Sequence, residues 1–143
     1  MFNIRNILVA VMILGNSIFL FAANARGYSR LYDAQTVTNL NGKVTRVEVL
    51  KSRGPDGGVH LQLKTDKEEI SVHLGPSWFL NGQNLNIKKD DVIEVKGSRV
   101  IIENRPAIIA AEIHQGDKMV ILRDQDGVPV WSGWRKRGPS ANQ

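Results

Sequence analysis

His60 and His73 are the residues whose types and spacing come nearest to a chemical site. Each stands among alternating apolar and polar residues, on either side of a short polar turn. This pattern predicts a β-hairpin that sets the two histidines opposite each other on its outer face, with Cβ atoms about 5 Å apart. Two neutral imidazoles at that separation can share a Zn, Cu or Ni ion, and His114 is the candidate for a third ligand. The alternative is two solvent-exposed histidines on a barrel face.

Two arginines, Arg99 and Arg123, lie within or at the end of predicted strands. A guanidinium there can hold the carboxylate or phosphate of a ligand in a two-bond fork. It can equally pair with a carboxylate of the chain itself, for which the candidates are Asp124, Asp126 and Glu112. Both arginines are therefore candidate ligand-binding residues, with a structural ion pair as the alternative.

Three tryptophans complete the candidate ligand-binding set: Trp78, Trp131 and Trp134. For Trp78, packing at the end of a barrel is the alternative to ligand contact, because a tryptophan buries a large apolar area. The other two precede a basic run, Arg135–Arg137, and predict either a partner surface or a cover over an open barrel edge. The basic run itself can touch phosphates, anionic lipid or an acidic partner, or remain a solvated tail.

The motifs of common enzymes are missing from the sequence: there is no Gly-rich phosphate loop, no Gly-x-Ser-x-Gly and no His-Glu-x-x-His. The chain has no cysteine, which excludes disulfides, thiolate metal sites and a catalytic cysteine. Asp124-x-Asp126-Gly127 matches only the start of a calcium loop and predicts a tight turn instead. We therefore predict a protein that is not an enzyme and needs no cofactor.

The first 25 residues have the three-part layout of a secretory signal. Arg5 supplies the positive charge, Ile7–Ala23 is almost wholly apolar, and Ala23-Asn24-Ala25 fits signal peptidase. We predict cleavage before Arg26 and a periplasmic or secreted bacterial protein with no stable membrane span afterwards. An uncleaved membrane anchor is the alternative. Residues 26–35 then form a polar lead-in segment.

The mature chain reads as short strands separated by turns. A first strand over Val37–Leu50 changes its apolar phase near the middle, which predicts a β-bulge. The clearest hairpin follows, with strands over Val59–Lys64 and Glu69–Leu74 joined by a two-residue turn. Its predicted register places Lys64 opposite Glu69, Leu63 opposite Ile70, Leu61 opposite Val72 and His60 opposite His73.

A short helix near Pro76–Gly82 comes next, because proline suits the first turn and Asn-Gly can end a helix. A long strand over Val92–Glu103 has a kink at Gly97-Ser98, where a bulge or bend resets the phase. The remaining predictions are turns and short strands: a turn at Asn104–Pro106, strands over Ala107–His114 and Met119–Leu122, a turn at Asp124–Gly127, and an edge segment over Val128–Trp134.

This order predicts an all-β fold, a small five-stranded Greek-key barrel of the OB type with one short helix between strands three and four. The barrel spans residues 36–134 and a basic tail spans 135–143. A β-sandwich fragment or an SH3-like barrel is the alternative fold. The two changes of phase fall where such a barrel bends its long strands.

Several stretches resemble exported bacterial OB-fold proteins: Asn41–Val44, Asp91–Ser98, His73–Trp78, Gly97–Arg99 and Leu122–Trp131. The likeness spans about Thr36 to Trp134. Over this range the chain is similar to an uncharacterised periplasmic OB-fold family, and more distantly to the BOF family linked to stress tolerance. The resemblance implies the fold and export.

The formal net charge of +5 is concentrated at the C-terminal end, and the folded body is near neutral. Nucleic-acid-binding domains usually carry a broad basic face and stack bases on aromatic residues. Residues 59–74 contain no Phe, Tyr or Trp. We therefore predict an exported binding protein whose ligand is a protein, an oligosaccharide or a small molecule. Nucleic-acid binding and metal binding through the paired histidines are the alternatives.

Overall fold

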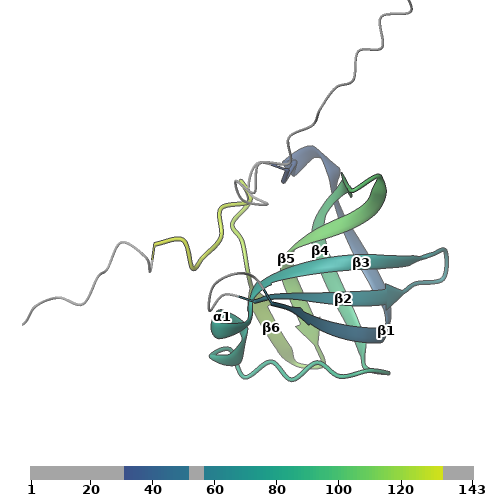
Figure 1. The fold of residues 1–143 in the computed structure, drawn as a ribbon, viewed down its shortest axis with the longest axis horizontal. Helices are drawn as coiled ribbons and strands as arrows, with labels where there is room; N and C mark the ends of the chain where they lie inside the picture. Colours follow the sequence, from purple (N-terminus) through teal and green to yellow (C-terminus); the bar gives the residue numbers. More distant parts are fainter. Residues whose placement is uncertain (1–30, 52–56, 134–143) are drawn as a thin grey trace, which may run out of the picture.

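The computed structural model describes residues 31–51 and 57–133 (Figure 1). The predicted signal segment, Trp134 and the basic tail lie outside the described residues. The described elements are η2 (Ala34–Thr36), β1 (Val37–Leu50), β2 (Gly58–Lys64), β3 (Glu69–Pro76), α1 (Ser77–Asn81), β4 (Val92–Ile102), β5 (Arg105–Gln115) and β6 (Lys118–Ile121). None of the helices among these residues is long and apolar enough to cross a membrane.

The strands form a closed barrel of the predicted OB type. Hydrogen-bonded neighbours follow the order β3-β2-β1-β4-β5-β6, and an additional parallel pairing of β3 with β5 closes the five-stranded barrel. The single short α-helix stands between β3 and β4, as predicted. It lies at one end of the barrel, away from the tight turn that joins β2 to β3 (Figure 1). β6 adds an edge strand beside β5.

β1 belongs to both halves of the barrel because it bends. Residues 37–43 pair with β4 and residues 43–50 pair with β2. The register shifts between Val44 and Arg46, which confirms the predicted bulge. Val44 is fully buried before the shift, and Val47 pairs with the core residue Leu61 after it. The bulge thus lies where the apolar phase changes, but Val47 and Val49 after it are 38% and 58% exposed and do not enter the core.

The β2–β3 hairpin has the predicted register from His60 to Lys64, and the register shifts between Val59 and His60. Leu63 pairs with Ile70 and Leu61 with Val72, so one face is apolar and buried. At the turn, the backbone N–H of Thr65 donates to the carbonyl oxygen of Glu68 over 2.8 Å. A slip of one residue would turn this apolar face to solvent, which explains why the sequence alone specifies the pairing.

A second bulge lies beside Gly97, where the sequence predicts a bulge or bend, but the extra residue belongs to β5 and not to β4. Lys96 pairs with Glu112 and Gly97 pairs with Ala110, so the extra residue is Ala111. A side chain at Gly97 would meet the carbonyl oxygen of Ile109, and glycine therefore lets the bulged strand approach closely. Val100 and Ile102 are half-buried between exposed neighbours, as the predicted change of phase requires.

Several boundaries differ from the prediction: β2 begins one residue earlier, at Gly58, and β3 extends two residues further, to Pro76. The turn after β4 consists of Glu103 and Asn104, both with positive φ, so Arg105 and Pro106 already belong to β5. β6 begins and ends one residue earlier than predicted. The segment after Asp124–Gly127 joins the fold through an isolated bridge between Arg123 and Pro129 and forms no strand within the described residues, because Pro129 lacks the N–H that a ladder needs.

We expect Gly97→Ala to lower the free energy of unfolding by about 1–3 kcal/mol, the usual cost of overpacking a close-packed site. The added methyl would lie 2.7 Å from Cγ2 of Ile108 and closer still to the backbone of β5. Gly133→Ala is the matched control, because a Cβ at Gly133 meets nothing within 4 Å. Urea denaturation measures both, and equal midpoints for the two variants would contradict the close approach.

Candidate functional site

Arg123 is part of the barrel wall. Arg123 is only 4% exposed. Its Nη1 donates to the carbonyl oxygens of Leu74 in β3 and Ala110 in β5. The parallel pairing of these strands covers residues 71–73 and 107–109, so Arg123 bonds the strands just where their pairing ends. The structural alternative for Arg123 is therefore present, although with other partners, and its role in binding a ligand stays a prediction. The described partners of Arg123 are backbone carbonyls rather than the predicted carboxylates, because the strands diverge there and leave acceptors to satisfy.

Trp131 covers the same side of the barrel. Its ring lies against Gly75, contacts the ring of Phe79 at a centroid distance of 5.1 Å, and has the guanidinium carbon of Arg123 5.1 Å from its centroid. Trp78 packs edge-on against Phe79 and half-buried against the core. Both tryptophans therefore pack against the core, as the packing alternatives expect, and their contact with a ligand stays a prediction. Trp134, the third predicted tryptophan, lies outside the described residues.

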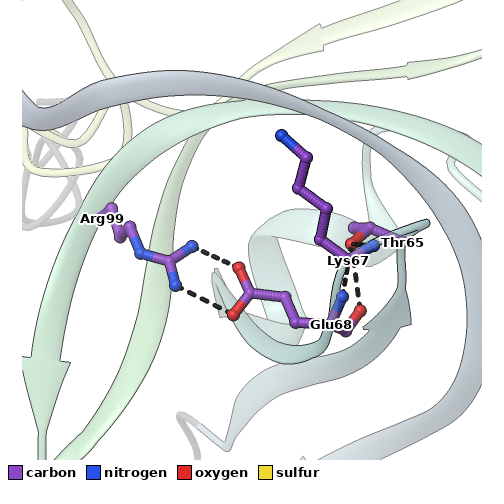
Figure 2. A network of polar contacts seen from close by, with 4 residues as sticks. All are labelled: Thr65, Lys67, Glu68 and Arg99. Carbon is purple, nitrogen blue, oxygen red and sulfur yellow. Dashed lines mark hydrogen bonds and ion pairs between the residues drawn. The ribbon is translucent and has the colours of Figure 1, made fainter.

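Arg99 does hold a carboxylate in a fork, but the carboxylate is Glu68 of the same chain (Figure 2). Nη2 donates to Oε2 over 2.9 Å, and Nη1 donates to Oε1. The hydrogen bond from Arg99 lowers the pKa of Glu68. The side chains are 40% and 31% exposed, so the pair contributes at most about 1 kcal/mol to stability. The partner differs from those predicted because the hairpin turn brings Glu68 to β4.

His60 and His73 pair across β2 and β3 as predicted, with their rings stacked at a centroid distance of 3.7 Å and an angle of 25°. The expectation of two solvent-exposed histidines is wrong for His73, which is 7% exposed. Burial, followed by the neighbouring His60 and Arg123, lowers the pKa of His73 to about 4. Burial also lowers the pKa of His60, and the Glu48 carboxylate opposes that shift.

The histidine pair offers two imidazoles for a metal ion, and a stable zinc site normally needs three or four ligands. Within residues 31–51 and 57–133, no group of three or more His, Cys, Asp or Glu side chains is placed to hold a metal. His114 lies elsewhere, in β5, with its Nε2 3.5 Å from Oε2 of Glu112. His114, the candidate third ligand, is therefore not placed with His60 and His73 to hold a metal.

A groove of about 460 Å³ lies on the outer face of β4 and β5. Residues of the lead-in segment and of the C-terminal turn line the groove together with this face. We call it the groove, and its lining residues are Tyr32, Ala34, Val37, Lys96, Ala111, Glu112, Arg123, Asp124, Gln125 and Asp126. Its volume falls in the range of small-ligand sites.

Hydrogen bonds hold the lead-in wall of the groove in place. The buried Ser98 of β4 bonds through its Oγ with the backbone N–H of Asp33 and with the Thr36 hydroxyl, each over 2.9 Å. The ring of Tyr32 lies against Gly127, where a Cβ would collide with it and where φ is +81°. Glycine at this position therefore allows the tyrosine to pack on the turn. Burial raises the pKa of the Tyr32 hydroxyl.

The floor and the opposite wall are polar and ordered. Nζ of Lys96 lies 3.0 Å from Oε1 of Glu112, and this hydrogen bond lowers the pKa of the carboxyl group. In the turn, Oδ1 of Asp124 accepts the backbone N–H groups of Asp126 and Val128, each over 2.9 Å. The prediction of a tight turn is confirmed. The turn presents two exposed carboxylates to the groove.

Sequence reasoning missed the groove. Its opposite-charge pair of Lys96 and Glu112 is the one feature that the correct strand register would have revealed. Lys96 and Glu112 face each other only when the Ala111 bulge is known, since without it the register is off by one residue. Tyr32 and the turn residues reach the groove through tertiary packing, which has no local signature. Of the predicted site residues, Arg123 alone lines the groove, while His60, His73, Trp78, Arg99 and Trp131 do not.

Comparison with known proteins gives one family. The sequence model of the MamS/MamX magnetosome protein family matches residues 36–120. This segment begins one residue before β1 and ends within β6, so it contains the whole closed barrel. No curated protein matches the chain. Of the groove, the matched segment includes Val37, Lys96, Ala111 and Glu112, and the rest of the lining flanks it.

Proposed function

Because the chain belongs to the MamS/MamX magnetosome protein family, we propose that it is an exported, magnetosome-associated protein that binds a ligand and performs no catalysis. The ligand is a protein, an oligosaccharide or a small molecule, and it binds in the groove. The groove carries this proposal, because it is a concave site that combines apolar side chains with convergent polar groups.

The absence of catalysis in this proposal is supported by the contacts that the potentially reactive side chains make within the fold. The guanidinium of Arg123 holds two strands together, and that of Arg99 is engaged by Glu68. His73 is buried and stacked. A general base must reach the proton that it removes from a substrate. The groove has no histidine in its lining, and its one lysine is paired with Glu112.

Export and location are tested together in cells that make magnetosomes. We expect the mature chain to begin at Arg26, since the small-x-small cleavage pattern ends at Ala25. We also expect the protein in the purified magnetosome fraction. N-terminal sequencing and immunoblotting of the fractions measure this, and Ala25→Arg, which spoils the cleavage site, is the control. A protein found in the cytoplasm with Met1 intact would refute the proposal.

A further inference from the structure

We propose that the groove binds an organic cation, an ammonium or guanidinium group on an aliphatic stem, such as a lysine or arginine side chain of a peptide or a polyamine. This inference rests on the proposed function, in that it takes the groove as the binding site and names the chemistry of its ligand. It rests on the lining of the groove and on the partners that the charged groups of the groove already have within the protein.

The cationic groups of the groove are engaged by the protein itself. Lys96 pairs with Glu112 over 3.0 Å, which neutralises one charge of each sign. Nη1 of Arg123 donates to the carbonyl oxygens of Leu74 and Ala110, and the residue is 4% exposed. An anionic ligand would therefore have to compete with Glu112 for Lys96, whose side chain is 45% exposed, and would find the guanidinium of Arg123 buried.

The anionic groups of the C-terminal turn are differently placed. Asp124 and Asp126 are both exposed and both line the groove. Asp124 uses Oδ1 for two backbone N–H groups, which fixes the direction of its carboxylate. A fixed carboxylate loses little side-chain entropy on binding, which favours a charge-assisted hydrogen bond to a cation.

The rest of the lining suits an aliphatic stem. The ring of Tyr32 and the side chains of Ala34, Val37 and Ala111 form an apolar surface beside the carboxylates. A methylene chain can pack there while its charged head stays at the wetter end, as lysine and arginine stems do on protein surfaces. The tyrosine face also attracts a cation electrostatically. A cation with an apolar stem therefore satisfies both halves of the groove.

Titration of the uniformly ¹⁵N-labelled mature chain followed by NMR tests this inference. The probes are N-acetyl-arginine amide and N-acetyl-lysine amide, and N-acetyl-citrulline amide is the neutral control of nearly the same shape as the arginine probe. We expect saturable shifts of the amides of Lys96, Glu112, Gln125 and Gly127 with the charged probes. Binding of the citrulline probe should be about tenfold weaker, the effect of one charge-assisted hydrogen bond. Spermidine in a parallel arm distinguishes a free polyamine from a peptide side chain.

Asp126→Asn keeps the shape of the turn and removes one charge, so it should weaken the arginine probe about tenfold. Asp117→Asn is the matched control, an exposed aspartate in the turn before β6 that does not line the groove. Equal binding of the arginine and citrulline probes, an unchanged affinity in Asp126→Asn, or no shift at these amides would each overturn the inference. A mature, magnetosome-located chain that ignores all cationic probes would refute the cation alone and leave the proposed function standing.

Discussion

Arg123→Met is expected to lower the free energy of unfolding by about 3 kcal/mol or more. The substitution keeps an unbranched side chain of similar length but removes the donor that serves the carbonyl oxygens of Leu74 and Ala110. Each buried acceptor left without a partner costs about 1–3 kcal/mol, and the contact of the guanidinium with Trp131 is lost as well. Chemical denaturation followed by tryptophan fluorescence and by circular dichroism measures the loss.

Arg99→Met provides the matched comparison, because the same change of residue removes the more conspicuous ion pair of Figure 2. Its partner Glu68 is exposed enough to be solvated after the arginine is lost, so we expect a cost of at most about 1 kcal/mol. If Arg99→Met proved the more damaging variant, the assignment of Arg123 to the seam between β3 and β5 would be wrong.

Acidification from pH 7 to pH 4 is expected to remove about 3 kcal/mol of stability through His73 alone. The pKa of His73 is lowered to about 4 by burial and by the nearby positive charges of His60 and Arg123, whereas the unfolded chain titrates near 6.5. Above pH 6.5 both states are neutral at this residue and nothing is lost. Between pH 6.5 and 4 only the unfolded state binds the proton, so stability falls as the pH falls. The difference in pKa corresponds to about 3 kcal/mol.

His73→Gln isolates this contribution, because glutamine has nearly the same polarity and does not titrate. The free energy of unfolding of the wild type should fall more steeply between pH 6.5 and 4 than that of His73→Gln, by about 3 kcal/mol over the interval. His114→Gln, at a more exposed histidine of β5, should retain the steep fall of the wild type. Parallel curves for the wild type and His73→Gln would show that His73 takes up its proton without cost.

The elements that sequence reasoning placed correctly are those whose apolar pattern is local. In the β2–β3 hairpin, strict alternation and a two-residue turn leave a single register that buries Leu61, Leu63 and Ile70. The bulge of β1 also leaves a local trace, since Leu40 and Val47 lie in opposite phases. Side-chain period and turn length are enough to specify such features.

The functional residues could not be placed in the same way, because their partners are distant in sequence. Arg123 meets Leu74 across 49 positions, and Arg99 meets Glu68 across 31. An arginine at the end of a strand has the same local pattern whether it faces a ligand, a carboxylate or a divergent pair of strands. Ala111 gives no signal of its bulge, because alanine fits either face of a strand and residues 107–111 of this strand are all buried.

Photo-crosslinking in living cells shows whether the groove is the surface that meets a ligand. A photoreactive amino acid placed at Gln125, which lines the groove, is compared with the same amino acid at Gln62 on β2 and at Asp117 before β6. We expect a discrete adduct from position 125 that is lost in the presence of excess N-acetyl-arginine amide, and none from the other two positions. An adduct from position 62 with none from position 125 would place the binding surface on the β2–β3 face and show that the groove is not the ligand site.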